Sequence, residues 1–219
     1  MIIAGIYTAP VTPSRDRPIG PYERRLVRVQ AWDPRVADVA AAVSAIVRER
    51  LPMLHLEHIG STSVPGLPGK GIVDLGTEAE ASEIPAITET LYELGFGPQP
   101  GPDPWPPTRP MVVGSYTLDG REYRVHLHVH PLGGDFAQDL RFRDALRADP
   151  ELARRYAEIK LGIVGETDAS LEGVVYQAAK GGWILKTYDR LGIPRPQQPV
   201  STPSAGTTPG TAVGEEVRS

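Results

Sequence analysis

The chain has 219 residues, of which 40% are hydrophobic and 23% are charged, so it has enough apolar material for one globular domain with its own core. It contains no cysteine, which excludes disulfides, thiolate metal ligands and cysteine nucleophiles. Any metal ion must then be held by carboxylates, imidazoles, carbonyls or a substrate. The net charge of −4 provides no broad basic face, so we expect no duplex nucleic-acid partner.

The hydropathy pattern also bears on the expected compartment. No apolar run approaches the roughly 20 residues that cross a bilayer, and the first residues lack the basic leader of a signal peptide. We therefore expect a cytoplasmic protein without membrane contact. Nothing in the sequence sets an oligomeric state.

The N-terminal half of the chain predicts two helices among three strands. Asp33 is suited to cap a helix, Pro34 suits its first position, and apolar residues continue at helical spacing to about Arg50. A loop rich in Pro and Gly separates the second and third strands. The predicted elements are an extension over 1–22, strands over 24–31, 53–59 and 71–75, and helices over 34–50 and 85–94.

The C-terminal half predicts a hairpin followed by helices. Asp119-Gly120 favours a tight hairpin turn because both positions accept positive φ. Residues 97–110 include seven prolines, which predicts a surface loop or lid. The remaining predicted elements are strands over 111–118 and 122–130, helices over 136–148, 150–162 and 171–191, and a disordered tail rich in Pro, Ser, Gly and Thr over 194–219. One domain is therefore expected over 23–193.

A Gly-Ser pair follows the predicted strand at 53–59. Gly60 lets the backbone come close to an anion, while neighbouring amides and the hydroxyl of Ser61 can point toward a phosphate. Such pairs are common in ordinary turns after strands, so the dipeptide alone is more typical of a simple turn than of a phosphate site.

Two longer blocks make this pair more specific. The stretch HIGSTSVPGLPGK, from His58 to Lys70, resembles the signature of the GrpB family. A second stretch, from His126 to Lys160, matches the family in order and spacing through HLHV, LRFRDALR and PELA, and Tyr176 with Lys180 matches a weaker terminal motif. The resemblance covers about residues 23–192. It implies an α/β (α+β) fold in which a nucleotidyltransferase-like mixed sheet is flanked by helices, with a helical C-terminal segment.

The resemblance also implies roles for particular residues. Active nucleotidyltransferases use Gly-Ser for the nucleotide phosphates and an Asp-x-Asp pair for divalent metals; here Gly60, Ser61 and Thr62 take the first place and Asp74 the first acid position. Two carboxylates at i and i+2 share one face of a strand and can hold two cations about 3.5–4 Å apart. Gly76 stands at the second acid position, which puts the two-metal mechanism in doubt. One carboxylate can still hold one Mg²⁺ when triphosphate oxygens complete its shell.

Glu78 is the other acid on this stretch. If the strand continues, Glu78 lies on the same face as Asp74 and could replace the missing acid. Alternatively, it begins an exposed acidic run that continues at Glu80 and Glu83.

All five histidines lie on two of the predicted strands. Alternation places His126, His128 and His130 on one face, and three imidazoles suit Zn, Fe, Cu or Ni. By analogy with the family, this strand faces the same cleft as Asp74. The alternative is that these side chains line the cleft as polar groups without metal.

Three basic residues are candidates for binding phosphate. Lys70 precedes the strand of Asp74, Arg143 lies on the helix predicted over 136–148, and Lys180 lies on the last predicted helix. The competing interpretation is a solvated helix face on which Arg143 pairs with Asp139. Lys180 could equally pack at the edge of the core.

We therefore expect an enzyme that transfers a nucleotidyl group from ATP or another nucleoside triphosphate to a small-molecule acceptor with Mg²⁺, using Asp74, His126 and His128 at the catalytic centre. Two alternatives stay open. One is a metal-dependent enzyme whose transition metal is ligated by His126, His128 and His130 with Asp74. The other is a non-catalytic nucleotide-binding module. Segments similar to GrpB are also found joined to dephospho-CoA kinase, but the sequence lacks the Gly-x-x-x-x-Gly-Lys-Ser/Thr phosphate loop, so we assign no kinase activity.

Overall fold

The structure, a computed structural model, describes residues 17–101, 105–166 and 174–196. Within these ranges the strands form one mixed sheet in the order β1-β2-β5-β4-β3. β2 and β5 pair in parallel, whereas the other neighbouring strands are antiparallel. The strands are β1 (Glu57–Ile59), β2 (Val73–Ala79), β3 (Gly97–Pro98), β4 (Met111–Leu118) and β5 (Arg121–Pro131).

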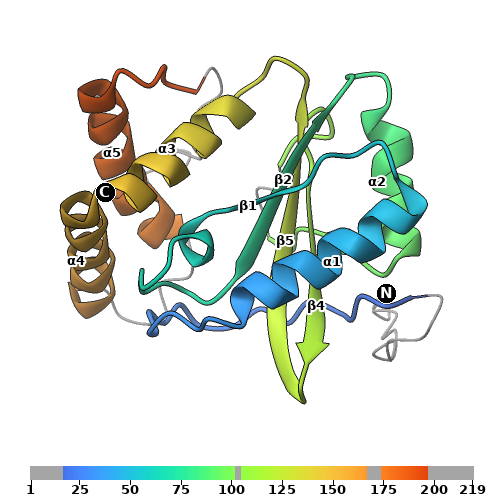
Figure 1. Ribbon diagram of the computed structural model, residues 1–219, viewed down its shortest axis with the longest axis horizontal. Helices are drawn as coiled ribbons and strands as arrows, with labels where there is room; N and C mark the ends of the chain where they lie inside the picture. Colours follow the sequence, from blue (N-terminus) through green and yellow to red (C-terminus); the bar gives the residue numbers. More distant parts are fainter. Residues whose placement is uncertain (1–16, 102–104, 167–173, 197–219) are drawn as a thin grey trace, which may run out of the picture.

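Helices cover both sides of this sheet. Figure 1 shows α1 and α2 on one side and α3, α4 and α5 gathered on the other. A single 3-10 turn, η1 (Ser61–Ser63), follows β1. The predicted mixed sheet flanked by helices, with a helical C-terminal segment, is confirmed. The helices are α1 (Val36–Arg50), α2 (Ile84–Glu93), α3 (Phe136–Ala148), α4 (Pro150–Glu166) and α5 (Val174–Leu191).

The main core lies between the sheet and the pair α1 and α2. Alternate residues of the two central strands are fully buried there, and they belong to the same apolar cluster as Val39 and Val43 of α1 and Leu91 of α2. Because successive side chains of a strand point to opposite faces, the residues between them face α3. The core residues of the central strands are Val73, Leu75, Val125, Leu127 and Val129.

A second apolar cluster holds the C-terminal helices against the loop that follows η1. Val64 and Leu67 of the loop pack with Leu146 of α3 and with Leu152 and Tyr156 of α4, and all five are buried. This cluster fixes the loop from η1 to β2 relative to α3 and α4.

The predicted hairpin is confirmed. β4 and β5 pair from Leu118↔Arg121 onward, and Asp119 and Gly120 both adopt positive φ, at 49° and 74°. Two consecutive residues with positive φ form the tight turn that matches the twist of the flanking strands.

The strand predicted over 24–31 is wrong. The segment contains only an isolated bridge between Gln30 and Gly69, and Leu26 is 54% exposed. Both alternating faces of the segment carry arginine, so neither face offers a continuous apolar row for the sheet to bury.

Several predicted boundaries shift. α1 begins at Val36 rather than Pro34, although the Asp33 carboxylate does accept a hydrogen bond from the Arg35 amide, at 3.1 Å. β1 is shorter than the strand predicted over 53–59, and Met53 is 93% exposed. β2 runs beyond the predicted end at Leu75 because it gains partners on both sides. Residues 1–16 of the expected extension and 197–219 of the expected tail lie outside the described residues.

Candidate functional site

The parallel register of β2 and β5 builds the candidate site. Asp74 lies beside His126, and Gly76 lies beside His128, so the polar side chains of the two strands share one face. An oxygen of Asp74 lies 3.3 Å from His126 Nδ1 and 3.6 Å from His128 Nε2. One potential ligand atom from each of the three side chains lies within 4.8 Å of the others. We call Asp74, His126 and His128 the acid-imidazole cluster.

The cluster is partly shielded from water. Its side chains are 24% exposed at Asp74, 13% at His126 and 17% at His128. Burial acts to raise the pKa of the Asp74 carboxyl, but hydrogen bonds and charge from the two histidines hold it well below its ordinary value. Burial lowers the pKa of His126. At neutral pH the site therefore combines a carboxylate with a neutral imidazole at His126, the forms that ligate metal.

His130 shares the face of the cluster but is not part of it. Its side chain is fully buried, and its Nδ1 accepts a hydrogen bond from Arg109 Nε at 3.2 Å. That bond leaves the proton on Nε2, which lies 3.6 Å from an oxygen of Asp139. Burial lowers the pKa of His130 to about 3. The structure thus directs His130 toward α3, so the predicted three-histidine metal set is reduced to two histidines and Asp74.

Gly60 brings the chain against Asp74. Its φ is 69°, and a Cβ at this position would lie 2.5 Å from Asp74 Oδ2. A side chain is therefore excluded by contact as well as by backbone conformation. The Gly60-Ser61 turn thus lies directly against the acid, and Ser61 is half-buried. Its approach to a phosphate stays a prediction.

Thr62 is engaged inside the fold. Its hydroxyl donates to the Ile72 carbonyl at 2.9 Å and lies 3.0 Å from His58 Nε2. Because the hydroxyl proton goes to Ile72, His58 donates to Thr62 through Nε2. Burial lowers the pKa of His58 to about 4. Thr62 therefore ties the turn to β1 and the start of β2, rather than offering a free hydroxyl to a ligand.

Two lysines, Lys70 and Lys180, are predicted to bind phosphate, and their charges interact. Burial first, and then the charges of Lys180 and Arg124, lower the pKa of Lys70 to about 8, while Asp74 opposes the shift. Charges act on one another in this way only at short range in a salt-containing solution. The charge of Lys70, before β2, thus interacts with that of Asp74 and with that of Lys180 on α5.

Arg143 is tied to the protein itself. Its guanidinium donates to Glu57 at 2.7 Å, to the His58 carbonyl at 3.2 Å and to Asp144 at 2.8 Å, and its side chain is 10% exposed. It links α3 to β1, and the predicted pair with Asp139 is not the one formed. Binding of phosphate by Arg143 stays a prediction.

The second acid position is closed by an aromatic ring. A Cβ on Gly76 would lie 2.5 Å from Cε2 of Phe136 and 3.0 Å from Cδ1 of Ile59. Phe136, the first residue of α3, therefore fills the space that a second carboxylate would need. Glu78, the proposed substitute, lies further along the same strand and is exposed, which favours its interpretation as part of an acidic surface run.

Sequence reasoning missed several residues around the cluster. Tyr22, within the stretch read as an extension, places its hydroxyl 3.1 Å from His126 Nε2. Trp105, from the proline-rich loop, stacks edge-on against His128 at 5.5 Å, and the Arg109 guanidinium lies over its ring. The sequence did offer one signal for Trp105: it is an aromatic residue in a proline-rich surface loop, and loops often carry functional residues. Tyr176, matched in a terminal motif, has a side chain outside the described part of the structure.

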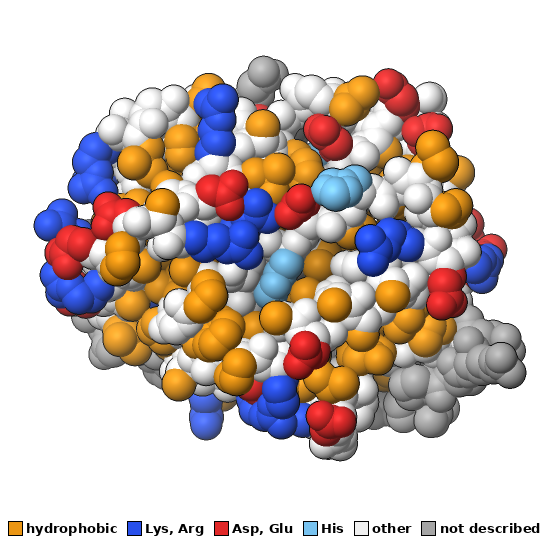
Figure 2. All heavy atoms as spheres, viewed as in Figure 1, with side chains coloured by type: hydrophobic (Ala, Val, Ile, Leu, Met, Phe, Trp, Pro, Cys, Tyr) orange, Lys and Arg blue, Asp and Glu red, His pale blue; other side chains and the backbone are white. Residues whose placement is uncertain are grey.

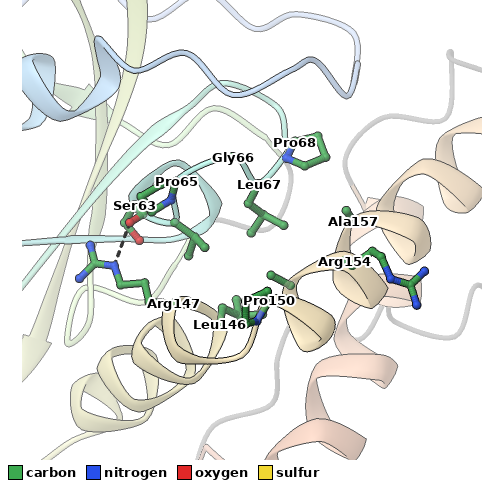
Figure 3. A pocket seen from close by; sticks show the side chains of 12 residues that line it. Ser63, Pro65, Gly66, Leu67, Pro68, Leu146, Arg147, Pro150, Arg154 and Ala157 are labelled. Atoms are coloured by element: carbon green, nitrogen blue, oxygen red, sulfur yellow. Dashed lines mark hydrogen bonds between the residues drawn. The ribbon is translucent and has the colours of Figure 1, made fainter.

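A largely apolar cavity lies away from the cluster. It has a volume of about 700 Å³ and runs between the loop after η1 and helices α3 and α4. Figure 3 shows Arg147 at one end, donating to the Ser63 carbonyl at 2.9 Å, and Arg154 with its guanidinium turned outward. Its lining is largely apolar. The chemistry of Asp74, His126 and His128 therefore lies outside this cavity.

The surface around these elements is mixed in charge. Figure 2 shows histidine side chains reaching one face of the molecule among Lys, Arg, Asp and Glu side chains. In the part of the chain that the structure covers, no helix is long and apolar enough to cross a membrane.

The chain is similar to proteins of several bacteria. A UPF0157 protein of Pseudomonas aeruginosa is 35% identical over 130 residues, covering 59% of this chain and 52% of that protein. A UPF0157 protein of Vibrio cholerae is 32% identical over 115 residues, covering 52% and 58%. The chain thus spans little more than half the length of these two relatives. A UPF0157 protein of Streptomyces coelicolor is 33% identical over 146 residues, covering 64% and 70%.

The fold and the family agree. The crystal structure of conserved protein GrpB from Enterococcus faecalis superposes with a TM-score of 0.51 at 19% identity, covering 74% of this chain and 99% of that one. An RNA terminal U-transferase gives only 0.38 at 16% identity over 65% and 47%, too low a similarity to argue from. The family model for GrpB protein matches residues 26–190, which include the Gly60-Ser61 turn and the whole acid-imidazole cluster. The chain therefore belongs to the GrpB family.

Proposed function

We propose that this protein is an enzyme that transfers a nucleotidyl group from a nucleoside triphosphate to a small-molecule acceptor, with one divalent metal ion held by Asp74, His126 and His128. The observation that carries the proposal is the grouping of these three side chains, with the Gly60 turn against Asp74 and the charge of Lys70 coupled to that carboxylate. A metal site beside a glycine turn and a partly buried cation suits phosphoryl chemistry, which needs charge stabilisation at the phosphate.

The donor set fits one borderline metal better than two magnesium ions. Mg²⁺ prefers an octahedral shell of oxygens, whereas two imidazoles with one carboxylate suit Mn²⁺, Fe²⁺ or Zn²⁺. Phe136 fills the space beside Gly76, so a second carboxylate cannot join the first. When bound, the ion would neutralise phosphate charge and polarise a P–O bond.

The protein's own groups have separable tasks in this proposal. Tyr22 lies at His126 Nε2, which directs the Nδ1 of that ring toward Asp74. Gly60 lets the turn lie directly against the carboxylate, because a side chain there would collide with Asp74 Oδ2. Lys70 and Lys180 supply charge that offsets the triphosphate. Arg143 holds β1 and α3 together and so fixes the depth of the site.

The proposal is tested by calorimetry on metal-stripped protein, titrated first with Mn²⁺, Zn²⁺ and Mg²⁺ and then with ATP, GTP, CTP and UTP. We expect Mn²⁺ or Zn²⁺ to bind more tightly than Mg²⁺, and a nucleotide to bind only with the metal. Asp74→Asn should weaken metal binding by about 100-fold, because it removes the ligand that carries charge. Glu78→Gln is the matched control, since it removes an exposed acid from the same strand.

Metal and nucleotide binding that is equal in the wild type and in Asp74→Asn would refute the assignment of the site. Turnover is then followed by release of pyrophosphate in the presence of a panel of small hydroxyl and amine acceptors.

The loss of the second acid supports one other candidate function, a nucleotide-binding module without transfer activity. Gly76 offers no second carboxylate beside Asp74, and Phe136 occupies the space beside it, which disfavours a two-metal transfer. Metal-dependent nucleotide binding without pyrophosphate release, across the acceptor panel, would favour this second candidate.

A further inference from the structure

Tyr22 places a hydroxyl group beside the acid-imidazole cluster. Its Oη lies 3.1 Å from His126 Nε2, and the centroids of the two rings are 5.3 Å apart. The other nitrogen of the same imidazole, Nδ1, lies 3.3 Å from Asp74. The phenol and the carboxylate therefore lie on the two sides of one ring. The proposed transfer gives this hydroxyl no part in the reaction, although a hydroxyl is a group that the acceptor can offer.

Two contacts of the neighbouring chain hold Tyr22 in this place. Before it, Gly20 forms a bridge with Ser115 of β4, in which each amide donates to the carbonyl of the other residue at 2.9 Å. After it, the Arg25 guanidinium lies 2.5 Å from the Glu122 carboxylate of β5. Figure 1 shows this segment, in blue, running past the lower parts of β4 and β5. The position of the tyrosine is thus fixed on both sides and not by its ring alone.

Two hydroxyls of the turn after Gly60 are engaged inside the protein. Ser63 donates to the Gly60 carbonyl at 2.6 Å, and Thr62 donates to the Ile72 carbonyl at 2.9 Å. Both residues are buried. Tyr22, in contrast, is half-buried, so solvent and a bound ligand can reach its side chain.

We propose that Tyr22 is a site at which the protein modifies itself, with the phenolic oxygen accepting the nucleotidyl group of a nucleoside triphosphate bound at the acid-imidazole cluster. The inference rests on the proposed function, which it deepens by naming an acceptor within the chain. Tyrosine is among the side chains that form covalent bonds to transferred groups. An acceptor that the fold holds in place also avoids the entropy cost of bringing a free molecule to the site.

The step balances without a further reactant. Tyr22 Oη forms a bond to the α-phosphorus, the bond from that phosphorus to the oxygen of the β-phosphate breaks, and pyrophosphate leaves with the electron pair. The phenol is protonated at neutral pH, since burial raises the pKa of Tyr22, and its proton passes to solvent water as the new bond forms. When Nδ1 of His126 ligates a metal, Nε2 keeps the ring proton and donates to Oη, so this hydrogen bond orients the phenol.

The test is incubation of the full-length protein with Mn²⁺ and each of ATP, GTP, CTP and UTP, labelled in separate reactions at the α- or the γ-phosphate. We expect the protein to retain the α label and not the γ label, because the γ-phosphate leaves within pyrophosphate. Mass spectrometry should show a gain of one nucleoside monophosphate, and peptide mapping should place it on Tyr22. Retention of the γ label, or no label with any of the nucleotides, would overturn the inference.

Two matched variants identify the acceptor. Tyr22→Phe keeps a ring beside His126 but removes the hydroxyl, so it should abolish the label. Tyr116→Phe should be labelled like the wild type, because Tyr116 is a half-buried tyrosine of β4 that packs against the main core. Mapping the label in the wild type separates loss of the acceptor from a displaced His126. Label on another residue, such as half-buried Ser61, or label that persists in Tyr22→Phe, would overturn the inference.

The two proposals fail in different ways. Metal-dependent nucleotide binding with pyrophosphate release to a small acceptor, in protein that never carries the label, would reject the self-modification and keep the proposed function. Tyr22→Phe should still bind metal, with an affinity lowered by about tenfold, because it loses a partner of His126 but keeps the three ligands. Label on Tyr22 that is equally strong in Asp74→Asn would keep the self-modification and reject the proposed metal site.

Discussion

The two faces of the β2–β5 pair differ sharply, although their residues alternate along the same two strands. On the face toward α1 and α2, Leu75 and Leu127 are fully buried in the main core. On the opposite face, Asp74 and His128 remain partly exposed and carry the candidate chemistry. The parallel pairing in register serves both, since it aligns apolar with apolar and polar with polar. Residues that stabilise the core therefore alternate with residues of the candidate site along each strand.

The largest effect should come from the core face. Leu127→Ala is expected to lower the free energy of unfolding by about 2–5 kcal/mol, because it leaves a cavity in a fully buried cluster. The neighbouring substitution, His128→Ala, should lower it by about 1 kcal/mol or less, since that side chain is partly exposed. Urea unfolding followed by circular dichroism measures both.

Metal binding should show the opposite order for the same two variants. His128→Ala should lose most of the metal affinity, whereas folded Leu127→Ala should keep it. If the two variants proved equally destabilised, the division of roles between the two faces would be wrong.

An intermediate effect is expected at Gly76, where the functional face packs closely against α3. Gly76→Ala should lower the free energy of unfolding by about 1–3 kcal/mol, because its methyl group would lie too close to Phe136 and Ile59. Phe136→Leu should relieve this contact, so the double variant should be more stable than the sum of the single changes predicts.

Gly182→Ala on α5 is the control, because alanine favours a helix and, among the described residues, nothing beyond the neighbouring helix backbone lies within 4 Å of a Cβ there. It should be neutral or slightly stabilising. Strict additivity of Gly76→Ala and Phe136→Leu in chemical unfolding would show that Phe136 does not close this position.

The smallest effect is the pH dependence of stability that comes from Asp33, which precedes α1. Hydrogen bonds from Arg35 lower the pKa of Asp33, burial opposes this, and the Tyr123 hydroxyl, which donates at 2.9 Å, lowers it further. A carboxyl with a depressed folded pKa stabilises the protein above its unfolded pKa, and this contribution is lost as pH falls toward the folded value.

We therefore expect Asp33→Asn to cost about 1 kcal/mol or less at neutral pH, and the difference from wild type to shrink below about pH 4. Unfolding of both proteins from neutral pH to about pH 3 measures this. A difference that grew on acidification would contradict the depressed pKa.

Much of the fold follows from local patterns. The Asp119-Gly120 turn predicted the hairpin because few other residues accept positive φ at both positions. Helical spacing predicted the helices of the C-terminal half within a few residues. The 24–31 segment was misread because alternation alone does not say whether a sheet edge is available to pair with it.

The candidate site was only partly predictable. The alternation of His126, His128 and His130 correctly placed them on one face, but not their different depths below the surface. His130 lies under Phe136 and faces Asp139, which depends on where α3 crosses the sheet. No local pattern contains that information.

The sequence by itself determined the alternating faces of β2 and β5, the glycine at the turn before the acid, the missing second carboxylate and the resemblance to the GrpB family. The tertiary structure decided that Phe136 fills the vacant position and that His130 turns toward α3. The physical reason is the distance along the chain over which each interaction acts. Backbone conformation and alternation act over a few residues, whereas the packing of helices on a sheet joins side chains that are far apart in the chain.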